Sequence, residues 1–347
     1  MPGGGGGPRP PPRPQPRAEE AGMGDEATAG TRVLISADGT VEAVDRGHVE
    51  ALLTEGRFFW LDVHRPGADD LALLRDVFRL HPLALEDVAH FNQRPKIDEY
   101  GDQALVVLYG ANEDEDRLVE VHAVLSGRYL VTLHRDDCPA FADLRRRAAG
   151  QRLAADEAAA LLYVVADALV DSFFPPLAAV DDRVDSLQDE ILARPDDAQL
   201  AEVFRLKHQL VTWRKVVTPQ RDLFARLAGG TVAVPGMSEE ARRYYRDVYD
   251  HLIRIAELLE GSRDLLSGTM DVYLSTVSNR LNEVMRQLTV VATLFMPLSW
   301  VVGFFGMNFG AMVRGVDGWL AFAGLGLGSQ AAAVAVMLYL FRRRGWM

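Results

Sequence analysis

The chain has 347 residues, of which 48% are hydrophobic and 25% charged, and its formal net charge is −12. This mixed profile is typical of a large soluble part joined to a short membrane part. The acidic balance argues against nucleic acid as a partner and leaves room for cation binding. A single cysteine, Cys138, excludes an internal disulfide.

The first residues are rich in Pro, Gly and Arg and carry no apolar core, so residues 1–30 are expected to be a disordered tail and not a signal peptide. From residue 31 to 150, β-like and helical runs alternate. We expect helices at about 68–80, 82–89 and 139–149, and strands at "RVLISAD", "RFFWLDV", "ALVVLYG", "VEVHAVLSG" and "RYLVTLH". The pattern predicts an α/β domain.

Residues 151–237 show no strand signal and are expected to be a helical region, with helices at about 156–194 and 196–228. A further helix is expected over 238–305. At 1.5 Å per residue it would be on the order of 100 Å long, far more than a bilayer needs. We therefore expect a stalk helix that begins outside the membrane and continues into a first transmembrane span.

Two charge-free runs lie near the C-terminus. No Asp, Glu, Lys or Arg occurs between Arg286 and Arg314, and a second apolar run covers 319–341, so each run is long enough to cross a bilayer. Residues 306–318 are left as a short external loop, and 342–347 form a basic tail. The positive-inside tendency places this tail and both termini in the cytosol of a multi-pass cell-membrane protein, whether the membrane is an inner or a plasma membrane.

The stalk helix carries a stripe of mostly small and polar residues spaced alternately by four and three positions, with Leu288 beside it as a possible constriction. Such a stripe points at the axis of a left-handed bundle of parallel copies. Either the small residues let helices pack closely, or the stripe lines a water-filled path with apolar rings that gate it. The residues are Asp271, Ser275, Ser278, Asn282, Met285, Leu288, Thr289, Ala292, Met296, Ser299 and Gly303.

The segment "DVYLSTVSNRLNEVMRQLTVVATLFMPLSWVVGFFGMNF" resembles the CorA family of magnesium and cobalt channels, with its GMN triplet closing the first of two C-terminal spans. "LEDVAHFNQRPKID" and "YYRDVYDHLIRIAELLEGSRDLLSG" extend the similarity over most of the chain. The resemblance implies an α+β membrane protein assembled as a homopentameric funnel, with no enzymatic activity. It implies a channel in the lipid bilayer for passive uptake of Mg²⁺ and Co²⁺, driven by the membrane potential. The channel would close when cytosolic Mg²⁺ binds between protomers.

The GMN triplet gives this expectation a physical basis. Mg²⁺ holds its water shell tightly, so a ring of neutral Asn308 carboxamides suits a hydrated ion grasped through its waters. Gly306 would let the backbone turn out of the helix, and Met307 would brace the turn against apolar surface. On spacing alone, Asn308 could instead be a helix cap at the membrane edge.

The resemblance also assigns the regulatory Mg²⁺ site to Asp87 in "LEDV" and Asp247 in "YYRDVYD". Carboxylates from two chains repel one another until a cation lies between them, so their approach would depend on Mg²⁺. Without the resemblance, both acids would be interpreted as part of a solvated helix face.

Two alternatives remain open at this point. The first is a proton-coupled Zn²⁺ transporter of the related ZntB type, in which Ile commonly replaces the Met of the triplet, so Met307 favours the magnesium branch. The second is a non-conducting membrane scaffold or sensor, which the polar stripe disfavours. The sequence leaves the preference among Mg²⁺, Co²⁺, Zn²⁺ and Ni²⁺ undecided.

The loop after the triplet departs from the family pattern. The family commonly has an acidic residue in "MPEL", whereas this chain has "MVRG", which places Arg314 where a carboxylate is expected. Arg314 could ring the mouth and repel divalent ions unless Asp317 cancels its charge, or it could point outward to lipid headgroups.

Overall fold

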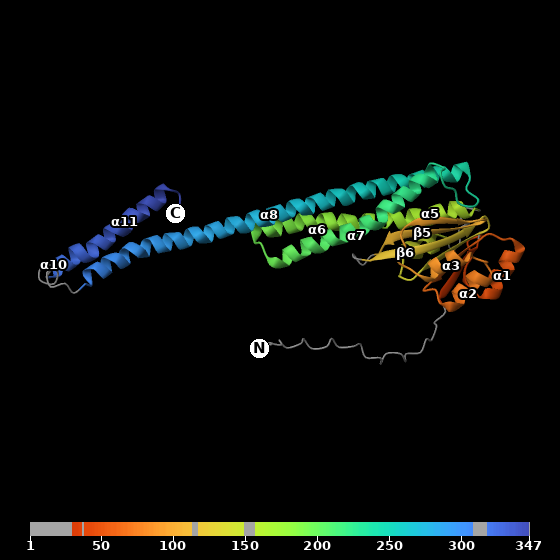
Figure 1. Ribbon diagram of the computed structural model, residues 1–347, viewed down its shortest axis with the longest axis horizontal. Helices are drawn as coiled ribbons and strands as arrows, with labels where there is room; N and C mark the ends of the chain where they lie inside the picture. Colours follow the sequence, from red (N-terminus) through yellow and green to blue (C-terminus); the bar gives the residue numbers. More distant parts are fainter. Residues whose placement is uncertain (1–29, 37, 113–116, 149–156, 308–317, 347) are drawn as a thin grey trace, which may run out of the picture. The chain divides into compact units, whose positions relative to one another are not determined.

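The computed structural model describes residues 30–36, 38–112, 117–148, 157–307 and 318–346. The predicted tail over 1–30 and most of the predicted external loop lie outside these ranges. The chain divides into two compact units: unit 1 combines Met1–Phe173 with Val216–Arg254, and unit 2 combines Phe174–Lys215 with Ile255–Met347. Element labels follow Figure 1.

Unit 1 is built on a seven-stranded mixed sheet with the strand order β2-β1-β3-β7-β6-β5-β4. The central pair β3 and β7 is parallel and the remaining pairs are antiparallel. The strands are β1 (Thr31–Ser36), β2 (Val41–Ala43), β3 (Phe59–His64), β4 (Lys96–Tyr100), β5 (Gln103–Ala111), β6 (Leu118–Ser126) and β7 (Tyr129–His134).

Helices cover both faces of this sheet. Alternate residues of β3, such as Phe59 and Leu61, belong to a buried core with α1 (Arg46–Glu55), α2 (Ala68–Asp76) and α3 (Pro82–Ala89). On the other face, Trp60 packs edge-on against Phe141 of α4 (Pro139–Ala148), and α5 (Ala158–Asp171) contacts β5. The approach of α5 is close, since a Cβ at Gly110 would come within 2.9 Å of the Leu169 side chain. The strands are therefore buried on both sides, as their continuous apolar runs predict.

The five predicted strands are confirmed to within two residues at each end. The sequence did not predict α1, the three-residue β2 or β4, whose sequence "KIDEY" is mostly polar. Helix α2 ends at Asp76, four residues before the predicted end at residue 80. The physical reason lies at Arg79, which adopts a left-handed backbone with φ 53°, while the Leu80 amide bonds back to the Leu74 carbonyl.

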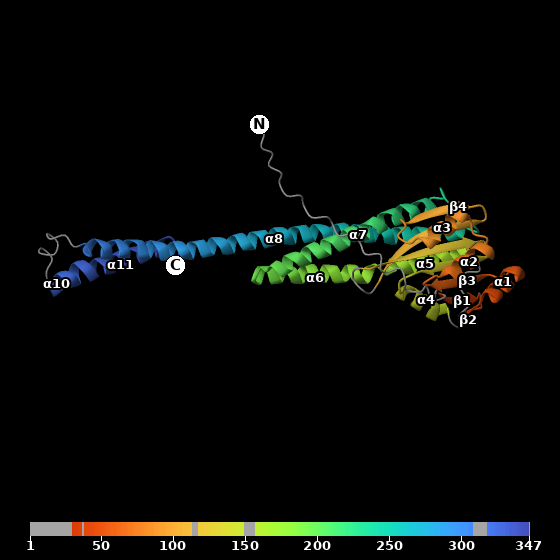
Figure 2. The same cartoon turned by 60° about the horizontal axis from the view of Figure 1, so that its bottom comes forward.

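Unit 2 is helical. It contains α6 (Phe174–Ala193) and parts of α7 (Asp197–Ala228) and α8 (Glu239–Phe305), which run side by side in Figures 1 and 2. Polar pairs tie the helices together: the Ser262 hydroxyl donates to Asp181 at 2.6 Å, and the Gln188 amide donates to Thr269 at 2.9 Å. From residue 157 onward the described residues form no strand, in agreement with the prediction.

The predicted helix over 156–194 is interrupted. Helix α5 ends at Asp171 and α6 begins at Phe174, with Ser172 and Phe173 between them. The Ser172 hydroxyl donates to the Leu169 carbonyl at 2.5 Å and accepts the Ala111 amide of β5 at 2.8 Å. The break therefore satisfies a backbone donor at the end of β5, a requirement that no local pattern reveals.

Helix α8 is continuous over 67 residues and ends at Phe305, as the sequence predicts. After the undescribed segment 308–317, α10 (Trp319–Ala321), a π-helical turn (Phe322–Leu327) and α11 (Gly328–Arg343) follow as one helical stretch. Among the described residues, three helical stretches are long and apolar enough to cross a membrane: Ala158–Ala193, Glu239–Phe305 and Trp319–Arg343. Half of the apolar window in the first stretch is buried, and α5 within it contacts the sheet, so we assign it to the protein core.

Candidate metal-ion pathway and cation sites

The predicted stripe lies entirely on α8. Its ten members, which begin at Asp271 and end at Gly303, are all exposed in the single chain, and so is Leu288 beside them. Large apolar side chains are exposed on the same helix, among them Phe295 at 65% and Trp300 at 67%. A soluble monomer rarely leaves such an apolar surface uncovered, so this part of α8 requires lipid or other protein around it.

The first two residues of the triplet, Gly306 and Met307, follow directly after the end of α8 at Phe305. The Gly306 amide still donates to the Val302 carbonyl at 2.9 Å, and a Cβ at Gly306 would come within 3.0 Å of that oxygen. A side chain at this position would therefore crowd the Val302 carbonyl. Met307 is 40% exposed, and its amide donates to the Phe304 carbonyl at 3.3 Å. Asn308, Arg314 and Asp317 lie outside the described residues.

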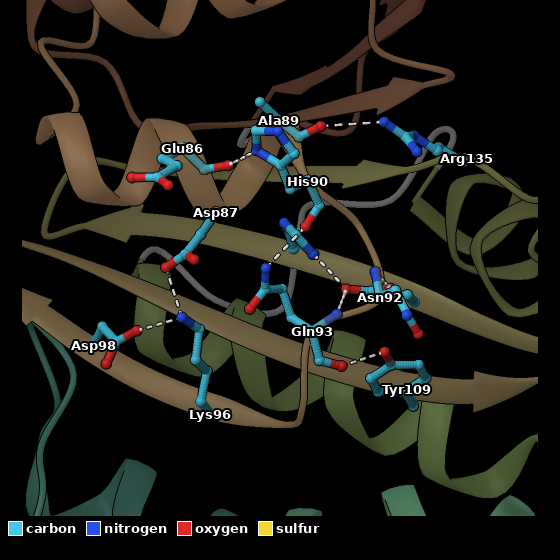
Figure 3. A network of polar contacts seen from close by, with 12 residues as sticks. Glu86, Asp87, Ala89, His90, Asn92, Gln93, Lys96, Asp98, Tyr109 and Arg135 are labelled. Carbon is cyan, nitrogen blue, oxygen red and sulfur yellow. Dashed lines mark hydrogen bonds and ion pairs between the residues drawn. The ribbon is translucent and has the colours of Figure 1, made fainter.

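Asp87 lies in the last turn of α3 beside two residues of β4. Its Oδ2 lies 2.6 Å from Nζ of Lys96, and the same ammonium lies 2.9 Å from Oδ2 of Asp98 (Figure 3). Lys96 and Asp98 are two residues apart on one strand and so share a face. Asp87 is thus paired with a lysine of its own chain, a partner that the sequence analysis did not predict.

The loop between α3 and β4 is anchored to the sheet. The Glu120 carboxylate of β6 accepts the backbone amides of Asn92 and Gln93, and the Tyr109 hydroxyl donates to the Gln93 carbonyl. Figure 3 shows the Tyr109 contact, with the pair of Lys96 and Asp98 to its left. Asn92 adopts φ 81°, which the two amide bonds to Glu120 hold in place.

Asp247 lies near a second acidic group in unit 1. One helical turn further along α8, Nδ1 of His251 lies 2.9 Å from Asp171 and 3.7 Å from Asp167 on α5. One possible ligand atom from each of His251, Asp171 and Asp167 lies within 4.8 Å of the others. Imidazole and carboxylate groups at this spacing can hold a divalent cation.

The electrostatics of this second group are those of crowded acids. Burial, and then the charge of Asp171, raises the pKa of the Asp167 carboxyl above its usual range. Burial and the charges of Asp167 and Asp247 raise the pKa of Tyr163 to about 12. A cation placed here would relieve repulsion that the folded chain otherwise carries.

Among the described residues, Asp87 pairs with Lys96, whereas Asp247 acts electrostatically on Asp167 and Tyr163, so the two acids have different neighbours in the single chain. The sequence analysis missed Asp167, Asp171 and His251, although a signal was present. Asp167 and Asp171 are four residues apart on a helix, and so are Asp247 and His251, so each pair lies on one face.

The fold and the two membrane-length helices define a membrane protein with a large soluble part. A profile of the family described as "CorA-like Mg2+ transporter protein" matches residues 55–343. The cobalt/magnesium transport protein CorA of Thermotoga maritima is 34% identical over 297 residues, covering 83% of each chain. The zinc transport protein ZntB of Yersinia enterocolitica is 24% identical over 272 residues, covering 77% of this chain and 82% of that protein.

Among solved structures, the complete CorA magnesium transporter from Methanocaldococcus jannaschii superposes with a TM-score of 0.75 at 20% identity, covering 91% of this chain and 99% of that one. That likeness confirms the architecture of an N-terminal α/β domain, a long helix and C-terminal helices. The chain belongs to the CorA-like family of divalent metal ion transporters. It is therefore a membrane transport protein and not an enzyme.

Proposed function

We propose that this protein is a homopentameric channel that conducts Mg²⁺, and also Co²⁺, into the cell down the membrane potential. Two transmembrane helices per chain cannot enclose a water-filled path, so the pathway requires several copies, with α8 inside and α11 facing lipid. Both termini and the α/β domain would then lie in the cytosol. The observation that carries the proposal is the stripe of exposed small and polar residues on α8, which ends at Gly303, three residues before Gly306 of the GMN triplet.

The driving force needs no coupled reaction. An inside-negative potential contributes about 2.3 kcal/mol per charge per 100 mV, so a divalent ion gains about 4.6 kcal/mol on moving inward. A ring of Asn308 carboxamides would select the hydrated ion at the mouth. The higher identity to a cobalt/magnesium transport protein than to a zinc transport protein supports the magnesium branch, as does Met307.

We further propose that cytosolic Mg²⁺ closes the channel through Asp87 and Asp247 of neighbouring protomers. The support is electrostatic: burial, and then the charges of neighbouring acids that include Asp247, raise the pKa values of Asp167 and Tyr163, so a bound cation would relieve repulsion beside Asp247. A cation that binds one state preferentially shifts the population toward that state.

The central experiment uses purified full-length protein in liposomes. Uptake of Mg²⁺, Co²⁺ and Zn²⁺ is compared with and without an imposed voltage and with and without a pH gradient. We expect Mg²⁺ uptake that depends on voltage and not on the proton gradient, and Asn308→Ala should abolish it while the oligomer remains intact. Zn²⁺ uptake that requires a pH gradient would identify the ZntB-like alternative, and near-normal flux in Asn308→Ala would refute the role of the triplet.

Regulation has a separate readout, which is the protection of the cytosolic part from protease by added Mg²⁺. Asp87→Lys or Asp247→Lys should abolish this protection and leave the channel open at high Mg²⁺. Unchanged protection in both variants would place the sensor elsewhere.

A further inference from the structure

The ion pairs of Lys96 raise a question about Asp87, because the proposed sensing carboxylate already holds a cation. The ammonium of Lys96 lies 2.6 Å from Asp87 and 2.9 Å from Asp98. The three side chains are 29%, 22% and 38% exposed, so the group is partly shielded from water and salt. Figure 3 shows Lys96 between the two carboxylates.

The charge of this lysine is maintained at neutral pH. A lysine ammonium ordinarily keeps its proton well above neutral pH, and both groups that it contacts here are carboxylates. Nearby, burial and the charges of Asp98 and Asp87 raise the pKa of Tyr100, so its phenol stays neutral. The group of Asp87, Lys96 and Asp98 therefore carries a net charge of about −1, where two carboxylates alone would carry −2.

The tether that brings Lys96 to Asp87 is itself fixed. Only eight residues separate the two along the chain, and the loop between them is held by Glu120 through the amides of Asn92 and Gln93. The His90 ring also contacts the Glu86 carbonyl at 2.9 Å at the end of α3. Because the loop is anchored at these points, the Lys96 ammonium stays close to Asp87, and its effective concentration there is high.

We propose that Lys96 is a built-in competitor for the cation at Asp87 and so sets the Mg²⁺ concentration at which the channel responds. This inference rests on the proposed regulatory role of Asp87. A divalent ion must either displace the ammonium or bind beside it. Either way, the affinity of the ion for Asp87 is lower than it would be without Lys96. When the ion leaves, Lys96 takes its place, so the carboxylates are not left to repel one another.

The charge of Lys96 determines how far the Mg²⁺ response should shift when that charge is removed. A unit positive charge about 4 Å from a divalent ion weakens binding by about tenfold even in screened water. Removing the charge of Lys96 while keeping its length should therefore shift the Mg²⁺ response to about tenfold lower concentration. Lys96→Arg retains the charge and should leave the response at or above the wild-type concentration.

The test is a Mg²⁺ titration of protease protection on the full-length protein in liposomes, with wild type, Lys96→Gln and Lys96→Arg in parallel. We expect the midpoint of Lys96→Gln to fall about tenfold and that of Lys96→Arg not to fall. If Lys96→Gln fails to assemble, Lys96→Met keeps the aliphatic stem and should show the same shift. A midpoint that stays at the wild-type value or rises in the neutral variants would overturn the inference.

A further variant separates this inference from the proposal beneath it. Asp87→Asn should raise the midpoint or abolish protection if Asp87 is a sensing residue. If Asp87→Asn behaves like wild type, the regulatory role of Asp87 is refuted, and the role of Lys96 with it. If Asp87→Asn alters the response and Lys96→Gln does not lower the midpoint, only the competitor role of Lys96 is refuted.

Discussion

The carboxylate of Glu120 lies 2.8 Å from Nε2 of His122 on β6 and accepts the backbone amides of Asn92 and Gln93 at the same time. His122 is fully buried and stacks on Phe91 at a ring distance of 4.4 Å. One buried acid thus fixes the loop that connects Asp87 to β4. The position of the proposed sensor depends on this pair.

Glu120→Gln should destabilise the protein at neutral pH by about 1–3 kcal/mol, because a charged acceptor of three hydrogen bonds becomes a neutral one. Burial would raise the pKa of Glu120, but the bonds from His122 and from the amides of Gln93 and Asn92 hold it below the usual 4.5. A carboxyl with a lowered folded-state pKa stabilises the protein above the unfolded value, and this contribution is lost as pH falls through the folded pKa.

The measurement is thermal unfolding of full-length protein in detergent at pH 7 and in steps below pH 4.5. The difference in melting temperature between wild type and Glu120→Gln should be largest at pH 7 and shrink with falling pH. Glu99→Gln on β4 is the control, because Glu99 is exposed. An equal difference at every pH would contradict the electrostatic explanation.

Gln220→Ala should cost about 2–4 kcal/mol, since the amide of Gln220 replaces a neighbouring strand at the end of β5. Its Oε1 accepts the Tyr109 amide at 2.7 Å and its Nε2 donates to the Tyr109 carbonyl at 3.1 Å, with Gln220 1% exposed. Truncation leaves both backbone groups buried without partners. The control is Arg221→Ala, because the ion pair of Arg221 with Asp222 is at the surface. The melting temperature of Gln220→Ala should be several degrees lower than that of Arg221→Ala. Similar values would show that water replaces the lost amide.

Asp167→Asn should stabilise the metal-free protein. The pKa of Asp167 is raised above the unfolded value of 3.8, so the folded state keeps the proton to higher pH. Stability contributed by this group is therefore lost as pH rises through the folded pKa, and at pH 7 the charged carboxylate opposes folding. In a chelator at pH 7 we expect the melting temperature to rise by a few degrees.

The same variant should show a smaller gain in melting temperature on adding Mg²⁺, because one possible ligand is gone. Asp189→Asn, a change at an acid on α6 in unit 2, is the control and should keep the full Mg²⁺ gain. An undiminished gain in Asp167→Asn would show that the cluster of Asp167, Asp171 and His251 takes no part in cation binding.

Arg314→Glu addresses the departure of the loop from the family pattern. At about 10 Å in water each Arg314 would repel a divalent ion by about 0.8 kcal/mol, which physiological salt reduces to a few tenths. In the proposed homopentamer, five copies together would reach about 1 kcal/mol. Mg²⁺ uptake at sub-saturating concentration should therefore rise several-fold in Arg314→Glu, and the gain should shrink at high salt. If Arg314→Glu raises the uptake rate by the same factor at low and at high salt, or does not raise it, then Arg314 lies at the lipid headgroups and does not repel ions at the mouth.

The sequence by itself determined the elements whose signal is local. Continuous apolar runs gave β3, β5, β6 and β7, and the charge-free stretch from Arg286 gave the end of α8 at Phe305. These features follow from hydrophobic periodicity and from the thickness of a bilayer. A short window of sequence around each element is enough to detect them. By the same reasoning, the three-residue β2 and the mostly polar β4 gave no local signal and were missed.

Only the tertiary structure decided which polar groups meet. Lys96 reaches Asp87 because β4 pairs with β5 beside α3, and Asp167 meets His251 because α5 packs next to α8 in unit 1. The break at Ser172 likewise exists to satisfy the backbone of β5. Asp167 and His251 are far apart in sequence, and Lys96 and Asp87, although nine positions apart, lie on different elements, so neither pair contributes to local periodicity. Their pairing is enforced by the cost of leaving buried charges and hydrogen-bonding groups unsatisfied, which arises only once the layers have packed.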